Sequence, residues 1–248
     1  INTPGGIAVG KEFYFKSGIS WNLVSSSINF SARYYPTGHI CNIASCSLFV
    51  DKKDQFFYTA FLNSKPVSLM LNILNPTVNV SSGVLGKLPV KRDFNSVQIN
   101  FINIKCEENI DISKKDWNSM ETSWDFEQSP LLNEKNYLEQ AVQTWQEQAT
   151  QDFFQLHTNE EELNRIFIDI YGLQEELTPE VALKDITILQ DELNKKDMVA
   201  LEDDFRANGA DPIELPIDRE EVISQFISYA IGLFMGRYRL DKTGLNIA

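Results

Sequence analysis

The sequence has few of the residues on which enzymes most often depend. Its 248 residues include two histidines and three cysteines, and no apolar run approaches the ~18 residues that a membrane-spanning helix needs. The odd number and wide spacing of Cys41, Cys46 and Cys106 are typical of a protein of the reducing cytoplasm rather than of a disulfide framework. No basic and apolar signal peptide opens the chain. We therefore expect a soluble, cytoplasmic protein without a membrane partner.

A metal site is not expected either. His39, Cys41 and Cys46 stand close together in the sequence, but no second pair of ligands follows them at zinc spacing. An unpaired cysteine usually behaves as a small buried hydrophobe. We therefore interpret the three cysteines as structural.

Several catalytic patterns are also missing. No glycine-rich loop follows a strand in the manner of a phosphate or dinucleotide site, and no serine or cysteine stands at a nucleophile elbow. The Glu-x-Lys pattern of a nuclease carboxylate–lysine cluster does not occur. The many carboxylates are dispersed over predicted helices, as on solvated faces. We expect these residues to be non-catalytic by themselves and to bind no cofactor.

What the sequence does have is an uneven distribution of charge around a net value of −13. Residues 1–92 contain nine Lys/Arg and three Asp/Glu, a net charge of +6, whereas residues 93–248 contain 13 Lys/Arg and 32 Asp/Glu, a net charge of −19. A local basic face can contact phosphates although the whole chain is acidic. It can equally be an ordinary solvated surface, and charge alone leaves both interpretations open.

Residues 12–58 of the basic part are predicted to consist mostly of strands and turns. Ile19, Trp21 and Leu23 alternate with polar residues, which is the period of a half-buried strand and assigns Trp21 to the core. Residues 30–35 alternate in the same way, and residues 47–50 form another short apolar strand. A pair of helices is expected near residues 54–74 and ends at a polar elbow, Asn75-Pro76-Thr77.

The acidic part is predicted to be mostly helical. Residues 95–106 fit either a strand or a helix. Ser113 with Asp116 would begin a helix, and a long amphipathic helix would cover residues 137–156. Asn159 with Glu162 would then cap a separate helix that ends at Gly172.

Further helix signals follow toward the C-terminus. Thr178-Pro179-Glu180 would start a helix, and residues 189–208 would form a charged, solvated one. Asp218 with Glu221 would open the last helix, which would pack with the long amphipathic helix as in a bundle. The apolar face of this last helix would consist of Val222, Ile223, Phe226, Ile227, Ala230, Ile231 and Phe234.

Together these patterns predict an α+β fold with two domains. Residues 1–92 would form a β-rich domain that includes the helical pair near residues 54–74. Residues 93–248 would form an acidic helical bundle or spacer region. Polar short side chains and basic residues are concentrated in the first domain.

Motifs in the first domain resemble the target-recognition domains of restriction–modification proteins. They are Gly18-Ile19-Ser20-Trp21, Arg33-Tyr34-Tyr35-Pro36-Thr37-Gly38, Leu62-Asn63-Ser64, Asn75-Pro76-Thr77-Val78-Asn79 and Leu88-Pro89-Val90. Longer motifs in the second region look like the PglX family. They lie within residues 116–126, 159–173, 226–230 and 236–238. PglX-like proteins are adenine-specific DNA methyltransferases of BREX phage-defence systems, related to combined restriction–methylation enzymes. The resemblance covers nearly the whole chain and favours a helix at residues 95–106.

The resemblance implies that this chain is the C-terminal target-recognition and spacer region of such a methyltransferase. Because it begins at Ile1 without a methionine, we expect a piece of a longer protein. The complete protein would bind S-adenosylmethionine in an upstream domain, flip an adenine and methylate its exocyclic nitrogen. The Asn/Asp-Pro-Pro-aromatic loop of that chemistry is missing here, since Asn75-Pro76-Thr77 lacks the second proline and the aromatic residue. The partners would be double-stranded DNA, the upstream methyltransferase domain and other defence proteins.

Reading duplex DNA requires basic side chains for phosphates and donor or acceptor groups that reach base edges. Arg33 stands beside Tyr34 and Tyr35 and could reach a guanine edge, stack on a base or pair with a carboxylate. The candidate DNA-binding residues are Lys11, Lys16, Ser20, Ser26, Arg33, Lys52, Lys53, Asn79 and Lys87. Each of them could instead be an ordinary solvated side chain.

Two alternatives stay open. The chain could be a specificity subunit of a multi-subunit restriction system, which would carry a second recognition domain. It could also be a protein-interaction module whose acidic helices bind a partner without any contact to DNA. Trp117, Trp124 and Phe126 are unusual aromatics in a polar segment, and they would either anchor that segment to a neighbouring domain or be buried within this chain.

Overall fold

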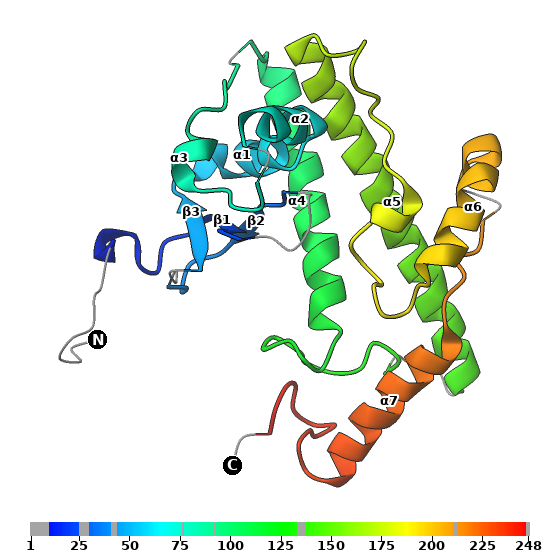
Figure 1. The fold of residues 1–248 in the computed structure, drawn as a ribbon. Helices are drawn as coiled ribbons and strands as arrows, with labels where there is room; N and C mark the ends of the chain where they lie inside the picture. The colour runs from blue at the N-terminus through cyan, green and yellow to red at the C-terminus, as the bar shows by residue number, and fades with distance from the viewer. Residues whose placement is uncertain are drawn as a thin grey trace. The chain divides into compact units, whose positions relative to one another are not determined.

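A three-stranded antiparallel sheet and a larger set of helices make up the computed structural model (Figure 1). It describes residues 10–24, 30–40, 44–75, 77–91, 93–132, 137–210 and 213–246. About 53% of the described residues are helical, and the predicted α+β class is confirmed. The chain divides into two compact units: unit 1 comprises residues 1–107 and 161–179, and unit 2 comprises residues 108–160 and 180–248.

These units divide the chain differently from the change in composition at residues 92 and 93. Residues 93–107 and 161–179 belong to unit 1 although they come from the acidic part of the sequence. Counted by unit, unit 1 has 11 Lys/Arg and ten Asp/Glu, a net charge of +1, whereas unit 2 has 11 Lys/Arg and 25 Asp/Glu, a net charge of −14. The extent of a DNA-recognition domain stays a prediction.

The sheet of unit 1 has the strand order β2-β1-β3 (Figure 1). β1 (Gly18–Asn22) lies between β2 (Arg33–Tyr35) and β3 (Ser45–Leu48) and is antiparallel to both. The alternation predicted for the first strand is confirmed, because Ile19 and Trp21 are only 0% and 4% exposed. The indole nitrogen Nε1 of Trp21 donates a hydrogen bond to the carbonyl oxygen of Val80 at 2.8 Å, so its one polar group is satisfied inside the core.

The predicted helical pair is confirmed as α1 (Gln55–Leu62) and α2 (Lys65–Leu74), with Pro66 in the first turn of α2. α1 packs against β1 and β2, where the Phe56 and Tyr34 rings meet edge to face at 5.5 Å. The other side of α1 contributes to an aromatic cluster with ring centroids 5.1–5.9 Å apart. Its members are Phe57, Phe61, Phe94, Phe167 and Tyr171. Residues 161–171 are thereby part of the core of unit 1.

The polar elbow after α2 holds the chain beside the end of β1. The Asn75 side-chain amide donates to the carbonyl oxygen of Asn79 at 2.6 Å, and the Thr77 hydroxyl donates to Asn75 Oδ1 at 2.9 Å. The Val80 N–H then donates to the carbonyl oxygen of Leu23 at 3.0 Å. The elbow therefore has a structural role in the described residues that flank Pro76, and the short helix α3 (Ser82–Leu85) follows it.

α4 (Ser96–Asn118) confirms the helix expected at residues 95–106 but corrects another prediction. No helix begins at Ser113 and Asp116, because both residues lie inside α4. Asp116 Oδ1 accepts a hydrogen bond from the backbone N–H of Leu189 at 3.0 Å. The carboxylate that resembled a helix cap thus satisfies the backbone of a distant loop in unit 2.

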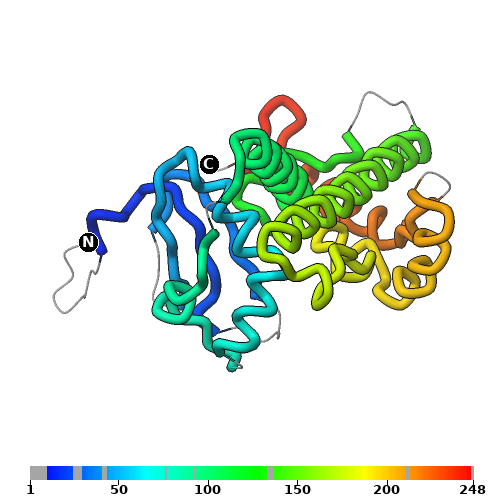
Figure 2. Tube along the Cα trace, turned by 90° about the horizontal axis from the view of Figure 1, so that it is seen from above, coloured from blue at the N-terminus to red at the C-terminus, as the bar shows by residue number. Residues whose placement is uncertain are grey.

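α5 (Leu138–Tyr171) runs without the break predicted at Asn159, as the continuous green-to-yellow trace in Figure 2 shows. Asn159 is fully buried, and its amide nitrogen donates to Glu108 Oε2 at 3.0 Å and to Asn109 Oδ1 at 2.8 Å. The prediction that Asn159 caps a separate helix is therefore wrong. Asn159 is a buried residue inside α5, and its side chain binds α4. The predicted end is confirmed, since Gly172 follows the helix with a left-handed φ of +68°.

Beyond α5, one further predicted helix start is wrong and two are confirmed. Thr178-Pro179-Glu180 begins no helix; a single short turn, η3 (Leu183–Asp185), follows it, and the imidazole of the buried His157 donates to the carbonyl oxygen of Val181 at 2.8 Å. The solvated helix is α6 (Lys195–Asn208). α7 (Arg219–Phe234) begins as predicted, with the Asp218 carboxylate accepting from the backbone N–H groups of Glu220 and Glu221.

The predicted packing of the long helix with the last helix is also confirmed, through a cluster of Ala141, Val142 and Val222 with Trp145 and Phe226 beside it. The predicted apolar face of α7 is wrong in part. Ile227 and Ile231 are each 52% exposed and Phe234 is 92% exposed. The reason is that Tyr229 and Gly232 of α7 face inward, toward Phe126 and Tyr238, and this orientation turns the three apolar residues to solvent.

Candidate nucleic-acid interface

The two faces of the sheet in unit 1 differ in chemistry. Side chains alternate between the faces of a strand, and directly paired residues share a face. Opposite the face that buries Ile19 and Trp21, the strands therefore present only glycine, short polar residues, one arginine and one tyrosine. We call this set the polar sheet face; it consists of Gly18, Ser20, Asn22, Arg33, Tyr35, Ser45 and Ser47.

The strand register places two predicted site residues side by side. Ser20 pairs with Arg33 on β2 and with Ser47 on β3, so these three residues form one row across the sheet. Arg33 is exposed, and the Ser20 hydroxyl donates to the carbonyl oxygen of Cys46 at 3.0 Å. This bond fixes the Ser20 oxygen and leaves its lone pairs as acceptors beside a guanidinium donor.

Tyr35 covers the start of β1 on the same face. A Cβ atom added to Gly18 would lie 2.8 Å from Tyr35 Oη and 3.1 Å from the carbonyl oxygen of Leu48. Only glycine therefore leaves room for the phenol ring at this position. The Tyr35 ring also meets the rings of His39 and Phe49 edge to face, at 6.1 and 6.5 Å.

Three of the predicted lysines gather at one end of the sheet. In this antiparallel arrangement the start of β1 lies beside the ends of β2 and β3, because Gly18 pairs with Tyr35 and Ile19 pairs with Leu48. Lys16 precedes β1, and Lys52 and Lys53 follow β3 in the short turn η2 (Lys52–Asp54). All three are exposed, and we call them the basic edge.

A hydrogen-bonded glutamine ties the segments of the basic edge together. The side-chain amide of Gln55, which is buried, donates to the carbonyl oxygens of Ser17 at 3.3 Å and Val50 at 3.4 Å. Its Oε1 accepts from the Ser17 hydroxyl at 3.2 Å. Gln55 thus links Ser17, which follows Lys16, to the segment that carries Lys52 and Lys53. The backbone at Lys16 is therefore held at a fixed distance from the backbone at the other two lysines.

The remaining predicted site residues are distributed more widely. Lys11 lies in η1 (Lys11–Phe13), whose Phe13 ring stacks on Phe49 at 4.5 Å, so it approaches the end of the sheet where the basic edge lies. Asn79 bridges Val24 beyond the opposite end of β1, and Lys87 follows α3; both are exposed. Ser26 lies outside the described residues.

Among the described residues, some lysines bond to oxygen atoms of unit 1 and others do not. The Lys91 ammonium donates to the carbonyl oxygen of Ile170 at 2.7 Å, and that of Lys105 pairs with Glu162 at 3.4 Å. By contrast, Arg33 and the lysines of the basic edge make no ion pair with any residue in the described ranges. The Lys16 ammonium lies 5.6 Å from the centroid of the uncharged Phe13 ring, which leaves its charge unneutralised. Their charge is therefore available to an anionic partner.

Asn63, which was quoted only as part of a motif, positions the strand that carries Arg33. Its Oδ1 accepts from the Ala32 N–H at 2.9 Å, and its Nδ2 donates to the carbonyl oxygens of Ala32 at 2.8 Å and Thr59 at 2.9 Å. Both backbone groups of the residue before Arg33 are thus held by one side chain at the end of α1. The sequence offered no signal for this role beyond the motif itself.

Among the described residues, no group of three His, Cys, Asp or Glu side chains could hold a metal ion. Cys41, one of the three residues that stand close together in the sequence, lies outside the described residues. Cys106 is buried, and burial raises the pKa of its thiol to about 12, as expected for a structural cysteine. In the described ranges, no helix is both long and apolar enough to cross a membrane.

No family model matches the chain, but two curated proteins are similar to it over almost its whole length. The first, the adenine-specific methyltransferase PglX of Lacticaseibacillus casei (strain Zhang), is 39% identical over 96% of this chain. The second, the adenine-specific methyltransferase BrxX of Escherichia coli O9:H4 (strain HS), is 30% identical over 96% of this chain. The chain matches a segment of the PglX and BrxX adenine-specific methyltransferases.

The match to PglX and BrxX confirms the resemblance found in the motifs, and it extends over both units. The chain spans 18% of the length of each of these two relatives. Most of a PglX-type protein therefore corresponds to no residue of this chain.

Proposed function

We propose that this chain is the target-recognition region of a PglX-type adenine-specific DNA methyltransferase in a BREX phage-defence system, and that unit 1 contacts double-stranded DNA. The observation that carries the proposal is the strand register, which sets Arg33 and Ser20 in one row on a polar sheet face next to the basic edge. Phosphate contacts and base contacts need these two kinds of group close together.

The two parts of the surface have different roles in this proposal. Lys16, Lys52 and Lys53 neutralise phosphates and so fix the position of unit 1 on the duplex. Arg33 donates to a base edge in the major groove, which is wide enough for a β-ribbon, while the serine hydroxyls donate or accept. Unit 2, with a net charge of −14, is repelled by the duplex and limits the contact to unit 1.

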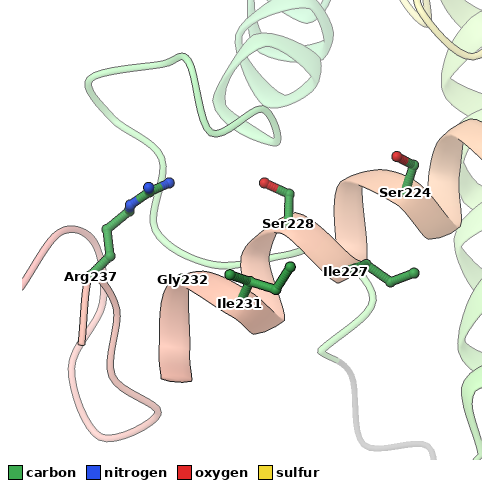
Figure 3. Close-up of a pocket in the computed structure, with 6 residues that line it drawn as sticks. All are labelled: Ser224, Ile227, Ser228, Ile231, Gly232 and Arg237. Carbon is green, nitrogen blue, oxygen red and sulfur yellow. The ribbon is translucent and has the colours of Figure 1, made fainter. Parts of the chain in front are cut away.

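S-adenosylmethionine and the reacting adenine are assigned to the rest of the protein. A hollow of about 300 Å³ on α7 is lined by Ser224, Ile227, Ser228, Ile231, Gly232 and Arg237 (Figure 3). It offers no carboxylate for ribose hydroxyls and no aromatic ring for an adenine, so these residues do not fit the cofactor. The upstream methyltransferase domain and other defence proteins are its proposed protein partners.

The proposal is tested by the salt dependence of duplex binding. Replacing Lys16, Lys52 and Lys53 together by glutamine removes three phosphate contacts, and the slope of log K against log salt should fall by about 2–3 in magnitude, since each contact contributes about 0.9. Fluorescence anisotropy of a labelled duplex, from low to moderate salt, measures this slope.

A matched control keeps the same loss of charge but moves it to unit 2. Lys184, Lys195 and Lys196 are also exposed, and their triple replacement by glutamine should leave the slope unchanged. Equal slopes for all three proteins, or no duplex binding at low salt, would contradict the proposal. Binding to a defence protein in place of DNA would support the alternative of a protein-interaction module.

A further inference from the structure

α7 is apolar on two faces, and the described residues of unit 2 cover only one of them. Val222 and Tyr229 are buried against their neighbours, whereas Ile227, Ile231 and Phe234 follow one another at i, i+4 and i+7 and are 52%, 52% and 92% exposed. Met235 continues this stripe with 75% exposure. We call these four residues the apolar ridge. A helix that is apolar on more than one side is normally covered on more than one side.

The ridge is held rigidly rather than exposed by a loose chain end. The Asp218 carboxylate caps the start of α7, and Gly232 near its end lies against the ring of Tyr238 so closely that a Cβ atom there would be 2.7 Å from the ring. Tyr238 in turn packs on Tyr229 and Phe126, with ring centroids 5.1 and 5.4 Å away. Figure 3 shows Ile227 and Ile231 projecting together from this fixed helix. A preformed surface loses little conformational entropy when a partner covers it.

We infer that the apolar ridge is the docking surface for the remainder of the same polypeptide, the part of a PglX-type protein that lies outside residues 1–248. This inference rests on the proposed function only in taking the chain as a segment of such a protein. The relatives it matches are more than five times its length, since the match spans 18% of each. In proteins of this kind, the remaining polypeptide is therefore a large, covalently attached partner that could cover the ridge.

Size and charge favour this occupant over a second copy of the chain. Four side chains fall well short of the roughly 800 Å² per partner that a stable free interface buries. An attached segment needs much less, because its effective concentration is on the order of millimolar. Two copies that met through their ridges would also bring together two units of net charge −14.

Thiol labelling tests the inference. Phe234→Cys is introduced into the 248-residue chain and into the full-length protein that carries it, and the rate of alkylation at position 234 is followed by peptide mass spectrometry. We expect labelling to be at least tenfold slower in the full-length protein. The control Val199→Cys, which is on α6 of the same unit and 53% exposed as valine, should label equally fast in both proteins.

Three outcomes would overturn the inference. The first is an equal labelling rate at position 234 in both proteins, and the second is equal protection of positions 199 and 234 in the full-length protein. The third is protection of position 234 in the short chain that increases with protein concentration, because this would assign the apolar ridge to a second copy. Phe234→Asp adds a second measurement, since it should lower the melting temperature of the full-length protein but not that of the short chain. Neither measurement involves DNA, so this inference and the proposed DNA contact can fail independently.

Discussion

Replacing Asn63 by alanine should destabilise unit 1 and loosen the strand that carries Arg33. The substitution removes three hydrogen bonds, two to the backbone of Ala32 and one to that of Thr59. Each such bond contributes a net ~0.5–1.5 kcal/mol. Because the Asn63 side chain is exposed, water replaces part of what is lost, and the expected destabilisation lies near the lower limit, about 1.5–2 kcal/mol.

Two assays follow this change. Urea denaturation, monitored by circular dichroism and tryptophan fluorescence, gives the free energy of unfolding. Amide hydrogen exchange at Ala32 reports the lost bond directly, and protection at this amide should fall. Asn72→Ala is the matched control: Asn72 is exposed on α2 and makes no side-chain hydrogen bond to another described residue, so its replacement should change stability by less than about 0.5 kcal/mol. A comparably small effect of Asn63→Ala with unchanged protection at Ala32 would refute the positioning role.

Two further predictions concern unit 2. Burial, together with the nearby carboxylates of Glu192, Asp191 and Asp152, raises the pKa of Asp116 to about 6 from an ordinary 3.8. As the pH rises, the unfolded chain therefore releases this proton before the folded protein does. The wild type should lose stability relative to Asp116→Asn between about pH 4 and about pH 6, as measured by urea titrations across that range. A constant difference in stability between the two proteins would contradict this prediction. Gly232→Ala should lower stability by about 1–3 kcal/mol in thermal denaturation, because the new methyl group would meet the buried Tyr238 ring. The control is Gly83→Ala, which should be neutral or stabilising because its methyl group would meet only Ser81 Oγ, at 3.8 Å. Equal effects of the two glycine substitutions would exclude the close packing at Tyr238.

The sequence was informative where a local period or cap decides the structure. The alternation around Trp21, the helical pair after residue 54 and the Asp218 cap all depend on neighbouring residues, and all are confirmed. Two of the three wrong helix starts have the opposite cause. Asp116 and Asn159 satisfy partners on other elements, 73 and about 50 residues away, and no local pattern distinguishes such residues from caps.

The candidate site was predictable in part for the same reason. Composition indicated the basic and polar residues of the first 58 positions, and Ser20 and Arg33 were among them. Their adjacency depends on the register between strands 13 residues apart, which no single-strand pattern fixes. Ser47 and Tyr35 were missed because only this register brings them to the same face. Ile227, Ile231 and Phe234 of the apolar ridge were assigned to the packed face of the last helix, because periodicity identifies an apolar stripe without indicating what covers it.

In the proposed function, the polar sheet face chooses the DNA sequence. The most direct test is to map methylated adenines in DNA modified by the full-length protein with wild-type Arg33, Arg33→Lys and Arg33→Ala. A bidentate arginine–base contact contributes about 1–3 kcal/mol of discrimination. We therefore expect Arg33→Ala to relax the requirement at one position of the target sequence while the others persist, with Arg33→Lys intermediate. An identical set of methylated sites for all three proteins would contradict the claim.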